Sequence, residues 1–326
     1  MRKLRLVVPL ALAMSLSVVP PTAAQPAPEA EVVEIAAELG PGFATAVSRQ
    51  GVIVGATPFP FTPWIWRNGT RTDLPTLGGA AVPQAINTRG DVVGWAEDGA
   101  DGPWVGVRWS RANIEVIEGF TVARDINDRG EIVGNGPEGA LHHWRGTTTV
   151  LPDGQSATAN AINQRGLIVG ALDSQAVAWR DGVLEYLPVA DPFPTERDNV
   201  AFDVSDRGHI VGNRWDMVDR DGFRLSPDGT YEELATWLGG FVVTVTGVDR
   251  FGRAIGTEGE ETTSFAIAWL PGADRPVQLA SYWDEDVWLE WWPSGANDIN
   301  DRGTVVGWVA DPETGRTTAV MWQLPR

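Results

Sequence analysis

The stretch 281–293 concentrates the residue types that could bind or cleave a carbohydrate. Within twelve residues it places four tryptophans and four carboxylates, namely Trp283, Asp284, Glu285, Asp286, Trp288, Glu290, Trp291 and Trp292. Aromatic faces beside carboxylates suit pyranose rings, through stacking and hydroxyl hydrogen bonds, and they also suit cations. Two interpretations stay open: an exposed binding patch, or a loop that plugs an opening with its aromatic side chains buried.

The carboxylates of this stretch are also candidates for glycoside hydrolysis. Asp284, Asp286 and Glu290 are the candidate catalytic residues, because two carboxylates on either side of a glycosidic bond can carry out this reaction. Sequence spacing does not fix the separation of ~5 Å or ~9 Å that such mechanisms require. Since surface carboxylates in an acidic chain are usually solvated, a non-catalytic protein is the first hypothesis. An exported carbohydrate-active hydrolase or lyase is the alternative.

Other kinds of chemistry find little support in the residue types. The chain has no cysteine and its only lysine is Lys3, so disulfides, thiolates and lysine-based catalysis are not expected. His142 and His143 are neighbours on a predicted strand and should point to opposite faces, which makes them poor joint metal ligands. The Asp-x-Asn-Asp runs at 125–128 and 298–301 partly resemble calcium loops. Turn formation explains them better, so we predict no metal and no cofactor, with calcium as the alternative.

A short repeated phrase determines the predicted architecture. Its seven copies, of the type Ile-Asn-Asp-Arg-Gly, end at Gly51, Gly90, Gly130, Gly166, Gly208, Gly252 and Gly303. Four residues after each of these comes a second glycine. A spacing of roughly forty residues is typical of propeller repeats.

One repeat unit, residues 158–188, shows what each copy should build. Its apolar segments alternate with Gly-containing turns, which predicts four antiparallel strands and no helix. Seven such units predict an all-β, seven-bladed β-propeller, because a ring lets every sheet bury both faces. The last unit ends after its third strand. The N-terminal segment 32–39 is therefore predicted to pair with the last blade and close the ring.

One aromatic residue recurs on the predicted third strands. The series is Trp66, Trp109, Trp144, Trp179, Trp269 and Trp322, with Phe223 in the fifth unit. A residue repeated in every unit belongs to the scaffold, so we predict a buried wedge between neighbouring blades. Trp95, Trp215 and Trp308 lie instead in loops predicted on the face opposite the repeated turns. With the four tryptophans of 281–293, they are the ligand-binding candidates.

The N-terminus predicts export. Residues 1–24 combine Arg2, Lys3 and Arg5 with an apolar run and small residues, as in a signal peptide, and 25–31 form a Pro/Ala-rich linker before the domain 32–326. Loss of 1–24 removes three positive charges and no negative one, which changes the formal net charge from −18 to −21. Such a charge disfavours nucleic acid and anionic lipid. No later segment is apolar over enough residues to span a membrane.

The repeat resembles that of the HAF-type extracellular repeat family. Residues 85–94 and 298–307 fit its Ile-Asn-x-x-Gly-x-Val-Val-Gly core, and 73–79 resembles its Gly-rich connector. The histidine of its His-Ala-Phe-x-Trp strand is replaced here, for example by Gln175 and Thr318. The resemblance covers about residues 32–326 and implies an exported protein without implying a common activity.

Together these observations predict a secreted or cell-envelope binding propeller. Its ligand would be a carbohydrate or an extracellular protein, and the site should lie where the repeat is interrupted, above all at 282–292. A purely structural envelope component is the remaining alternative.

Overall fold

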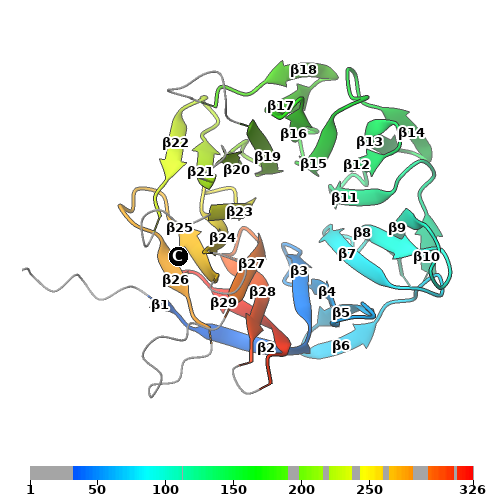
Figure 1. Ribbon diagram of the computed structural model, residues 1–326, viewed down its shortest axis with the longest axis horizontal. Helices are drawn as coiled ribbons and strands as arrows, with labels where there is room; N and C mark the ends of the chain where they lie inside the picture. The colour runs from blue at the N-terminus through cyan, green and yellow to red at the C-terminus, as the bar shows by residue number, and fades with distance from the viewer. Residues whose placement is uncertain are drawn as a thin grey trace, which may run out of the picture. The chain divides into compact units, whose positions relative to one another are not determined.

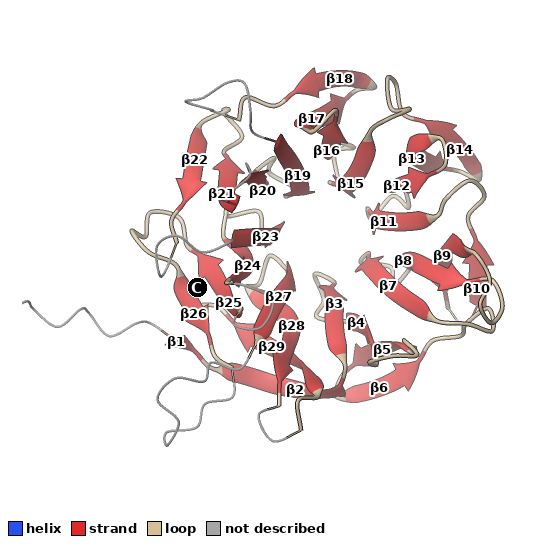
Figure 2. Ribbon diagram, in the orientation of Figure 1, coloured by secondary structure: helices blue, strands red, loops and turns tan. Residues whose placement is uncertain are grey.

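The computed structural model describes residues 32–111, 113–189, 198–215, 220–236, 243–259, 264–281, 293–311 and 314–325. All regular elements in these ranges are β-strands (Figure 2). The described ranges accordingly hold no helix with the length and apolar character needed to cross a membrane. The predicted all-β class is confirmed.

The strands form seven sheets around a centre, the blades of a β-propeller, each with four antiparallel strands and one with a short fifth strand added in parallel (Figure 1). Blade one contains β3 (Phe43–Val47), β4 (Ile53–Ala56), β5 (Pro63–Arg67) and β6 (Thr70–Asp73). Blade two contains β7 (Ala81–Ile86), β8 (Val92–Glu97), β9 (Trp104–Ser110) and β10 (Asn113–Val116). Blade three contains β11 (Val122–Ile126), β12 (Ile132–Gly136), β13 (Gly139–Trp144) and β14 (Thr147–Val150).

The remaining blades follow the same order from the centre outward. Blade four contains β15 (Thr158–Ile162), β16 (Ile168–Leu172), β17 (Gln175–Arg180) and β18 (Val183–Tyr186). Blade five contains β19 (Asp198–Val204), β20 (Ile210–Trp215), β21 (Arg220–Leu225) and β22 (Tyr231–Leu234). Blade six contains β23 (Val243–Val248), β24 (Ala254–Glu258), β25 (Phe265–Trp269) and β26 (Val277–Leu279). Blade seven contains β27 (Ser294–Ile299), β28 (Thr304–Ala310) and β29 (Thr317–Gln323).

The N-terminal segment closes the ring, as predicted. Strand β2 (Ile35–Pro41) pairs antiparallel with β29 and supplies the fourth strand of blade seven. The two residues of β1 (Val32–Val33) pair in parallel with β26 instead, so the start of the predicted segment extends blade six. The first and last parts of the propeller are thus held together by a sheet that contains both.

The repeated asparagine closes its own turn and ties its blade to the next. Oδ1 of Asn127 accepts the backbone N–H groups of Arg129 at 3.0 Å and Glu131 at 3.1 Å. Its Nδ2 donates to the carbonyl of Asn163 in blade four at 3.3 Å. The same two roles belong to Asn87, Asn163 and Asn300. The other three turns use residues that accept the N–H but have no amide to donate: Ser48, Ser205 and Asp249.

Both glycines of the repeat are required by backbone geometry. The seven turn glycines have φ between 79° and 93°, a region that L side chains rarely adopt. At the second glycine, an added Cβ would lie 1.8–2.2 Å from a carbonyl oxygen of the innermost strand in every blade. Gly134, for example, would clash with the carbonyl of Val122. The repeat therefore encodes a tight turn and a close strand contact rather than a recurring site.

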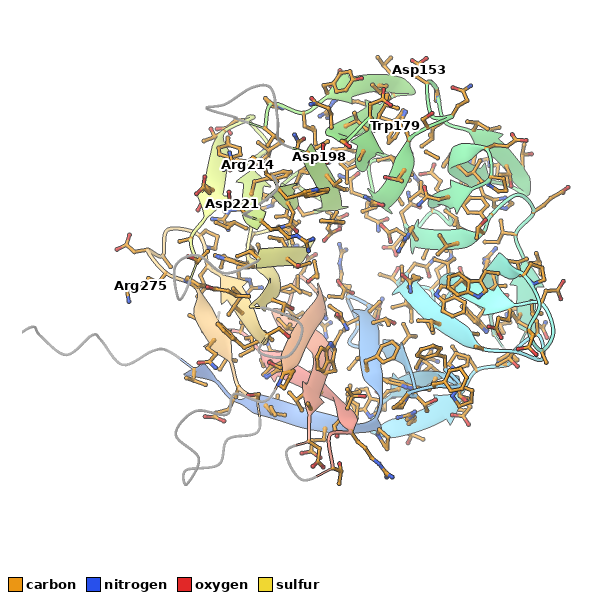
Figure 3. The ribbon with its side chains drawn as sticks, viewed as in Figure 1. Asp153, Trp179, Asp198, Arg214, Asp221 and Arg275 are labelled. Atoms are coloured by element: carbon orange, nitrogen blue, oxygen red, sulfur yellow. The ribbon has the colours of Figure 1, made fainter. Side chains whose placement is uncertain are left out.

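The repeated tryptophan is a wedge between blades in four units. These residues are Trp109, Trp179, Trp269 and Trp322, all buried. Each donates its indole N–H, over 2.7–2.8 Å, to a carbonyl in the connection that leaves the preceding blade. Trp179 (labelled in Figure 3), for example, donates to the carbonyl of Pro152 at 2.8 Å. The scaffold interpretation is confirmed for these four.

The predicted series was wrong in detail for blades one, three and five. Trp66 is half-buried, and Trp64 two residues earlier fills the core instead. Trp144 lies one residue beyond the wedge register of β13. Phe223 is buried but precedes the wedge register, which Leu225 occupies. In blades one and five the shift is two residues, which keeps a side chain on the same face of a strand, so alignment of the repeat alone does not detect it.

Ring closure by β2 can be tested at Leu39, which is 4% exposed and packs against Trp64 and Ala319. Leu39→Ala should lower the free energy of unfolding by about 2–5 kcal/mol, because the cavity opens where the chain ends meet. Urea denaturation measures the loss. Glu34→Ala, at an exposed position just before β2, should leave stability nearly unchanged; equal effects of the two variants would contradict closure by this strand.

Candidate functional site

A ring of seven side chains surrounds the central channel at the β-bulges of the innermost strands. In each blade the register between first and second strand shifts, which leaves one residue without a partner. Bulges re-aim side chains and recur beside functional sites. We call these residues the bulge ring; in blade order they are Thr45, Gln84, Arg124, Asn160, Phe202, Thr246 and Asn297.

Three aspartates lie one residue closer to the turns and are called here the channel aspartates: Asp125, Asp203 and Asp298. Oδ1 of Asp203 accepts the N–H of Val204 at 2.7 Å, and Oδ2 accepts that of Val248 in blade six at 2.8 Å. Asp125 and Asp298 make the same two bonds, toward blades four and one, all at 2.7 Å. Each carboxylate therefore caps its own bulge and joins the next blade.

Burial raises the pKa of all three carboxyl groups. Desolvation raises the pKa of Asp125 to about 6, against two backbone hydrogen bonds that lower it, and nearby Asp206 raises it further. Desolvation likewise raises the pKa of Asp203 to about 7, and the charge of Asp125 adds to the effect. The pKa of Asp298 is also raised well above its usual value by burial, then by Asp203. Near neutral pH the channel aspartates therefore carry fewer than three negative charges.

Aspartates and small residues alternate around the channel. At the aspartate position, blades one to seven carry Ala46, Ala85, Asp125, Ala161, Asp203, Gly247 and Asp298. Two aspartates on neighbouring blades would place two desolvated carboxylates side by side, which is unfavourable. Because seven is odd, the alternation fails once, where Ala46 and Ala85 follow each other. Strands β3 and β7, both fully described, are consequently not linked by a carboxylate.

Ion pairs cross the turn end of the channel. Arg49 of blade one pairs with Asp206 of blade five and, at 3.2 Å, with Asp301 of blade seven. Arg250 of blade six reaches Asp301 at 4.0 Å. The cavity at this end is small, ≈ 170 Å³, and residues of all seven blades line it. A larger pocket lies at the opposite end, the loop face.

A larger pocket lies at the loop end, over blades seven, one and two, where the alternation fails. This loop-end pocket has a volume of ≈ 450 Å³ and is lined by Phe43, Thr45, Val82, Gln84, Asn297, Trp308 and Thr317. Three of these belong to the bulge ring. The described lining combines aromatic faces with hydroxyl and amide groups, and it contains no charged side chain.

The polar groups of the loop-end pocket are only partly used by the protein. Nδ2 of Asn297 donates to the carbonyl of Ala44 at 2.7 Å, and the side chain of Gln84 makes only a 3.4 Å bond to its neighbour. Room for the indole of Trp308 comes from Gly295, where a Cβ would lie 2.6 Å from its Nε1. The pocket thus offers an aromatic face together with amide oxygens that have no partner in the described ranges.

An aromatic path leads from this pocket across the loop face of blades one and two. Phe43 contacts Phe61 with ring centroids 6.2 Å apart, and Phe61 contacts Trp95 at 6.3 Å. Trp95 in turn stacks on Trp104 at 4.7 Å. Phe59, 83% exposed, and Trp104, 57% exposed, present large apolar faces to solvent beside this path. Contiguous exposed aromatic residues of this kind typically mark a binding surface.

The structure brings together part of the predicted site. Trp95 and Trp308 occupy equivalent positions, each directly after the second glycine of its blade, at the aromatic path and the loop-end pocket. Trp215 lies apart on blade five, where Arg220 is 5.9 Å from its ring centroid. Seven candidates lie outside the described residues: Trp283, Asp284, Asp286, Trp288, Glu290, Trp291 and Trp292.

The calcium-like runs at 125–128 and 298–301 have other roles. Asp125, Asn127 and their counterparts Asp298 and Asn300 accept backbone N–H groups, as turn chemistry predicts. Among the described residues, no group of three or more His, Asp or Glu side chains could hold a metal ion.

Sequence reasoning missed the bulge ring, although the sequence carries a signal for it. The residue three positions before each repeated Asn, Ser or Asp changes chemical type from copy to copy, from Thr45 through Arg124 to Phe202. A position that varies inside an otherwise regular repeat carries a side chain whose type the shared scaffold does not fix. These positions lie on the innermost strands, whereas the site was predicted in the loops that interrupt the repeat.

Comparison with known proteins identifies the fold but not a family. No protein-family model matches the chain, and no curated protein matches its sequence. Virginiamycin B lyase from Staphylococcus aureus has a similar structure, with a TM-score of 0.56 and 12% identity over 88% of this chain and 99% of the lyase. This chain is a seven-bladed β-propeller related in structure to that lyase and to other propellers.

A second propeller gives the same result. The β-propeller domain of the Trilobed protease from Pyrococcus furiosus has a TM-score of 0.56 and 12% identity, over 89% of this chain and 97% of that domain. That domain has an open velcro topology, whereas β2 pairs with β29 here. At these identities the likeness shows the fold alone.

The channel aspartates predict that stability falls as pH rises toward neutrality. Their pKa values are higher in the folded chain than in the unfolded one, so the folded chain binds more protons between about pH 4 and pH 7. The resulting stabilisation is complete below about pH 4 and is lost as pH rises through about 6 for Asp125 and about 7 for Asp203. Each unit of pKa difference corresponds to about 1.4 kcal/mol.

Urea unfolding at pH 5 and pH 8 measures this effect. Asp203→Ala, which introduces the residue found in blades one, two and four, should reduce the difference between the two pH values. Glu115→Ala, at an exposed position on β10, should preserve it. A difference that Asp203→Ala leaves unchanged would show that this carboxyl does not titrate as stated.

Proposed function

We propose that the chain is a secreted, non-catalytic binding propeller that holds a carbohydrate in the loop-end pocket. One observation carries the proposal: in a chain with 43 acidic and 25 basic residues, the described lining of this pocket contains neither kind. Glycoside hydrolysis and elimination need an ionisable acid or base beside the reacting bond. Binding needs only shape, aromatic faces and hydrogen-bonding groups.

The lining suits a sugar ring in particular. Trp308 and Phe43 offer aromatic faces, on which the apolar C–H faces of a pyranose can stack. Thr45, Gln84 and Asn297 offer hydroxyl and amide groups for the sugar hydroxyls. The volume of ≈ 450 Å³ lies within the range of small-molecule pockets. A longer glycan would continue over the aromatic path toward Trp104.

An extracellular location agrees with this ligand. The signal-like segment 1–24 and the resemblance to HAF-type repeats support export. The reaction of virginiamycin B lyase is not carried over, because 12% identity supports the fold alone. An exported hydrolase or lyase and a structural envelope component are the alternatives that the following test separates.

Trp308→Ala should weaken glycan binding about tenfold, since one aromatic contact contributes on the order of 1 kcal/mol beyond its buried area. Calorimetric titration of the secreted chain against a panel of neutral and acidic oligosaccharides measures the affinity, and chromatography of the recovered sugar detects turnover. Trp144→Ala is the matched control, because it removes a tryptophan at the turn end of blade three. This variant should bind the glycan like wild type.

Three results would contradict the proposal. Shortened or unsaturated sugar products would identify an enzyme instead. Binding that Trp308→Ala and Trp144→Ala weaken equally would place the ligand outside the loop-end pocket. Failure of every oligosaccharide in the panel to bind would favour a structural role.

A further inference from the structure

Arg124 is the one charged member of the bulge ring. It lies on β11, between Gln84 on β7 and Asn160 on β15, and its strand contacts both neighbours. The chain runs along β11 from the loop end toward the turn, so Arg124 is farther from the turn end than Asp125. Its backbone position is therefore nearer to the loop end, where the larger pocket lies.

Arg124 has no hydrogen-bond or ion-pair partner in the described ranges, whereas nine other described arginines pair with carboxylates. Arginines that pair with carboxylates are Arg49, Arg89, Arg108, Arg129, Arg180, Arg214, Arg224, Arg250 and Arg253. Arg214, for example, pairs with Asp221 on blade five at 3.1 Å (Figure 3). The carboxylate of Asp125, directly next to Arg124, is occupied by two backbone N–H groups.

The surroundings of Arg124 favour an anionic partner. Although its side chain reaches solvent, enough protein surrounds it that desolvation lowers its pKa. Arginine stays protonated in proteins, so Arg124 presents an exposed positive charge on the innermost strand of its blade. A carboxylate would compensate that charge through two parallel N–H···O bonds. Because the pKa values of Asp125 and Asp203 are raised, these carboxyl groups carry less negative charge near neutral pH. They therefore compete less with a ligand carboxylate for Arg124.

We propose that the bound carbohydrate is acidic and that Arg124 binds its carboxylate, as in a uronic acid residue. This inference rests on the proposed function and names the substrate class for the same site. Gln84 lines the loop-end pocket, and its strand β7 contacts β11, the strand of Arg124. One ligand can therefore contact Gln84 and Arg124 at the same time. The bulge ring has no second cation, which suits a group with a single negative charge rather than a phosphate monoester.

Matched ligands provide the test. The secreted chain is titrated with oligogalacturonate, with its methyl ester and with a sulfated galactose oligomer of the same length, at fixed pH and salt. Wild type should bind the carboxylate about tenfold to a hundredfold more tightly than the ester, as expected for a charge-assisted hydrogen bond. Arg124→Gln should lose this preference and retain binding of the ester.

Arg67→Gln is the matched control, because it removes the same charge from an exposed position at the turn end of blade one. It should keep the preference for the carboxylate. Equal affinity of wild type for acid and ester, or a preference that survives in Arg124→Gln, would overturn the inference. Tighter binding of the sulfated oligomer than of the carboxylate would overturn the assignment to uronic acids.

The outcome also separates this inference from the proposed function. Binding of the ester that Trp308→Ala weakens, without preference for the acid, would sustain a carbohydrate site and reject the role of Arg124. Absence of binding for all three oligomers would reject both.

Discussion

The propeller depends on one side chain with two simultaneous roles, the turn asparagine. In Asn127 the carbonyl oxygen closes a turn while the amide nitrogen holds the next blade, so local turn geometry and ring geometry are fixed together. A buried amide with both ends satisfied is costly to replace. The residues that repeat are therefore committed to the scaffold. The positions free to vary between copies are others, above all the bulge ring.

The odd number of blades interrupts the alternation of channel aspartates and small residues once, and the loop-end pocket lies over that interruption. Each channel aspartate joins its blade to a following blade that carries a small residue at the same position. A ring with an odd number of blades cannot keep this alternation throughout. The unmatched step falls between Ala46 and Ala85, and the loop-end pocket lies over the same two blades. Across the turn end, the ion pairs of Arg49 leave a cavity of only ≈ 170 Å³. The channel thus differs at its two ends, although the repeat is nearly regular.

Most of the fold could be predicted from the sequence, because its signals are local. The turn glycines, the apolar alternation and the missing last strand predicted seven blades and closure by segment 32–39, where the structure pairs β2 (Ile35–Pro41) with β29. The site could be predicted only in part. Trp95 and Trp308 stood out by type, but their link through Phe43 and Phe61 depends on contacts between blades. Arg124 could not be recognised as unpartnered, since its surroundings come from strands far apart in sequence.

The most direct test of the account is a crystal structure of the chain with an acidic oligosaccharide bound. The account predicts a sugar ring against Trp308, with hydroxyl groups at Gln84 and Asn297 and a carboxylate at Arg124. Sugar density at the turn end of the channel, or at 282–292 with the loop-end pocket filled by protein, would contradict it.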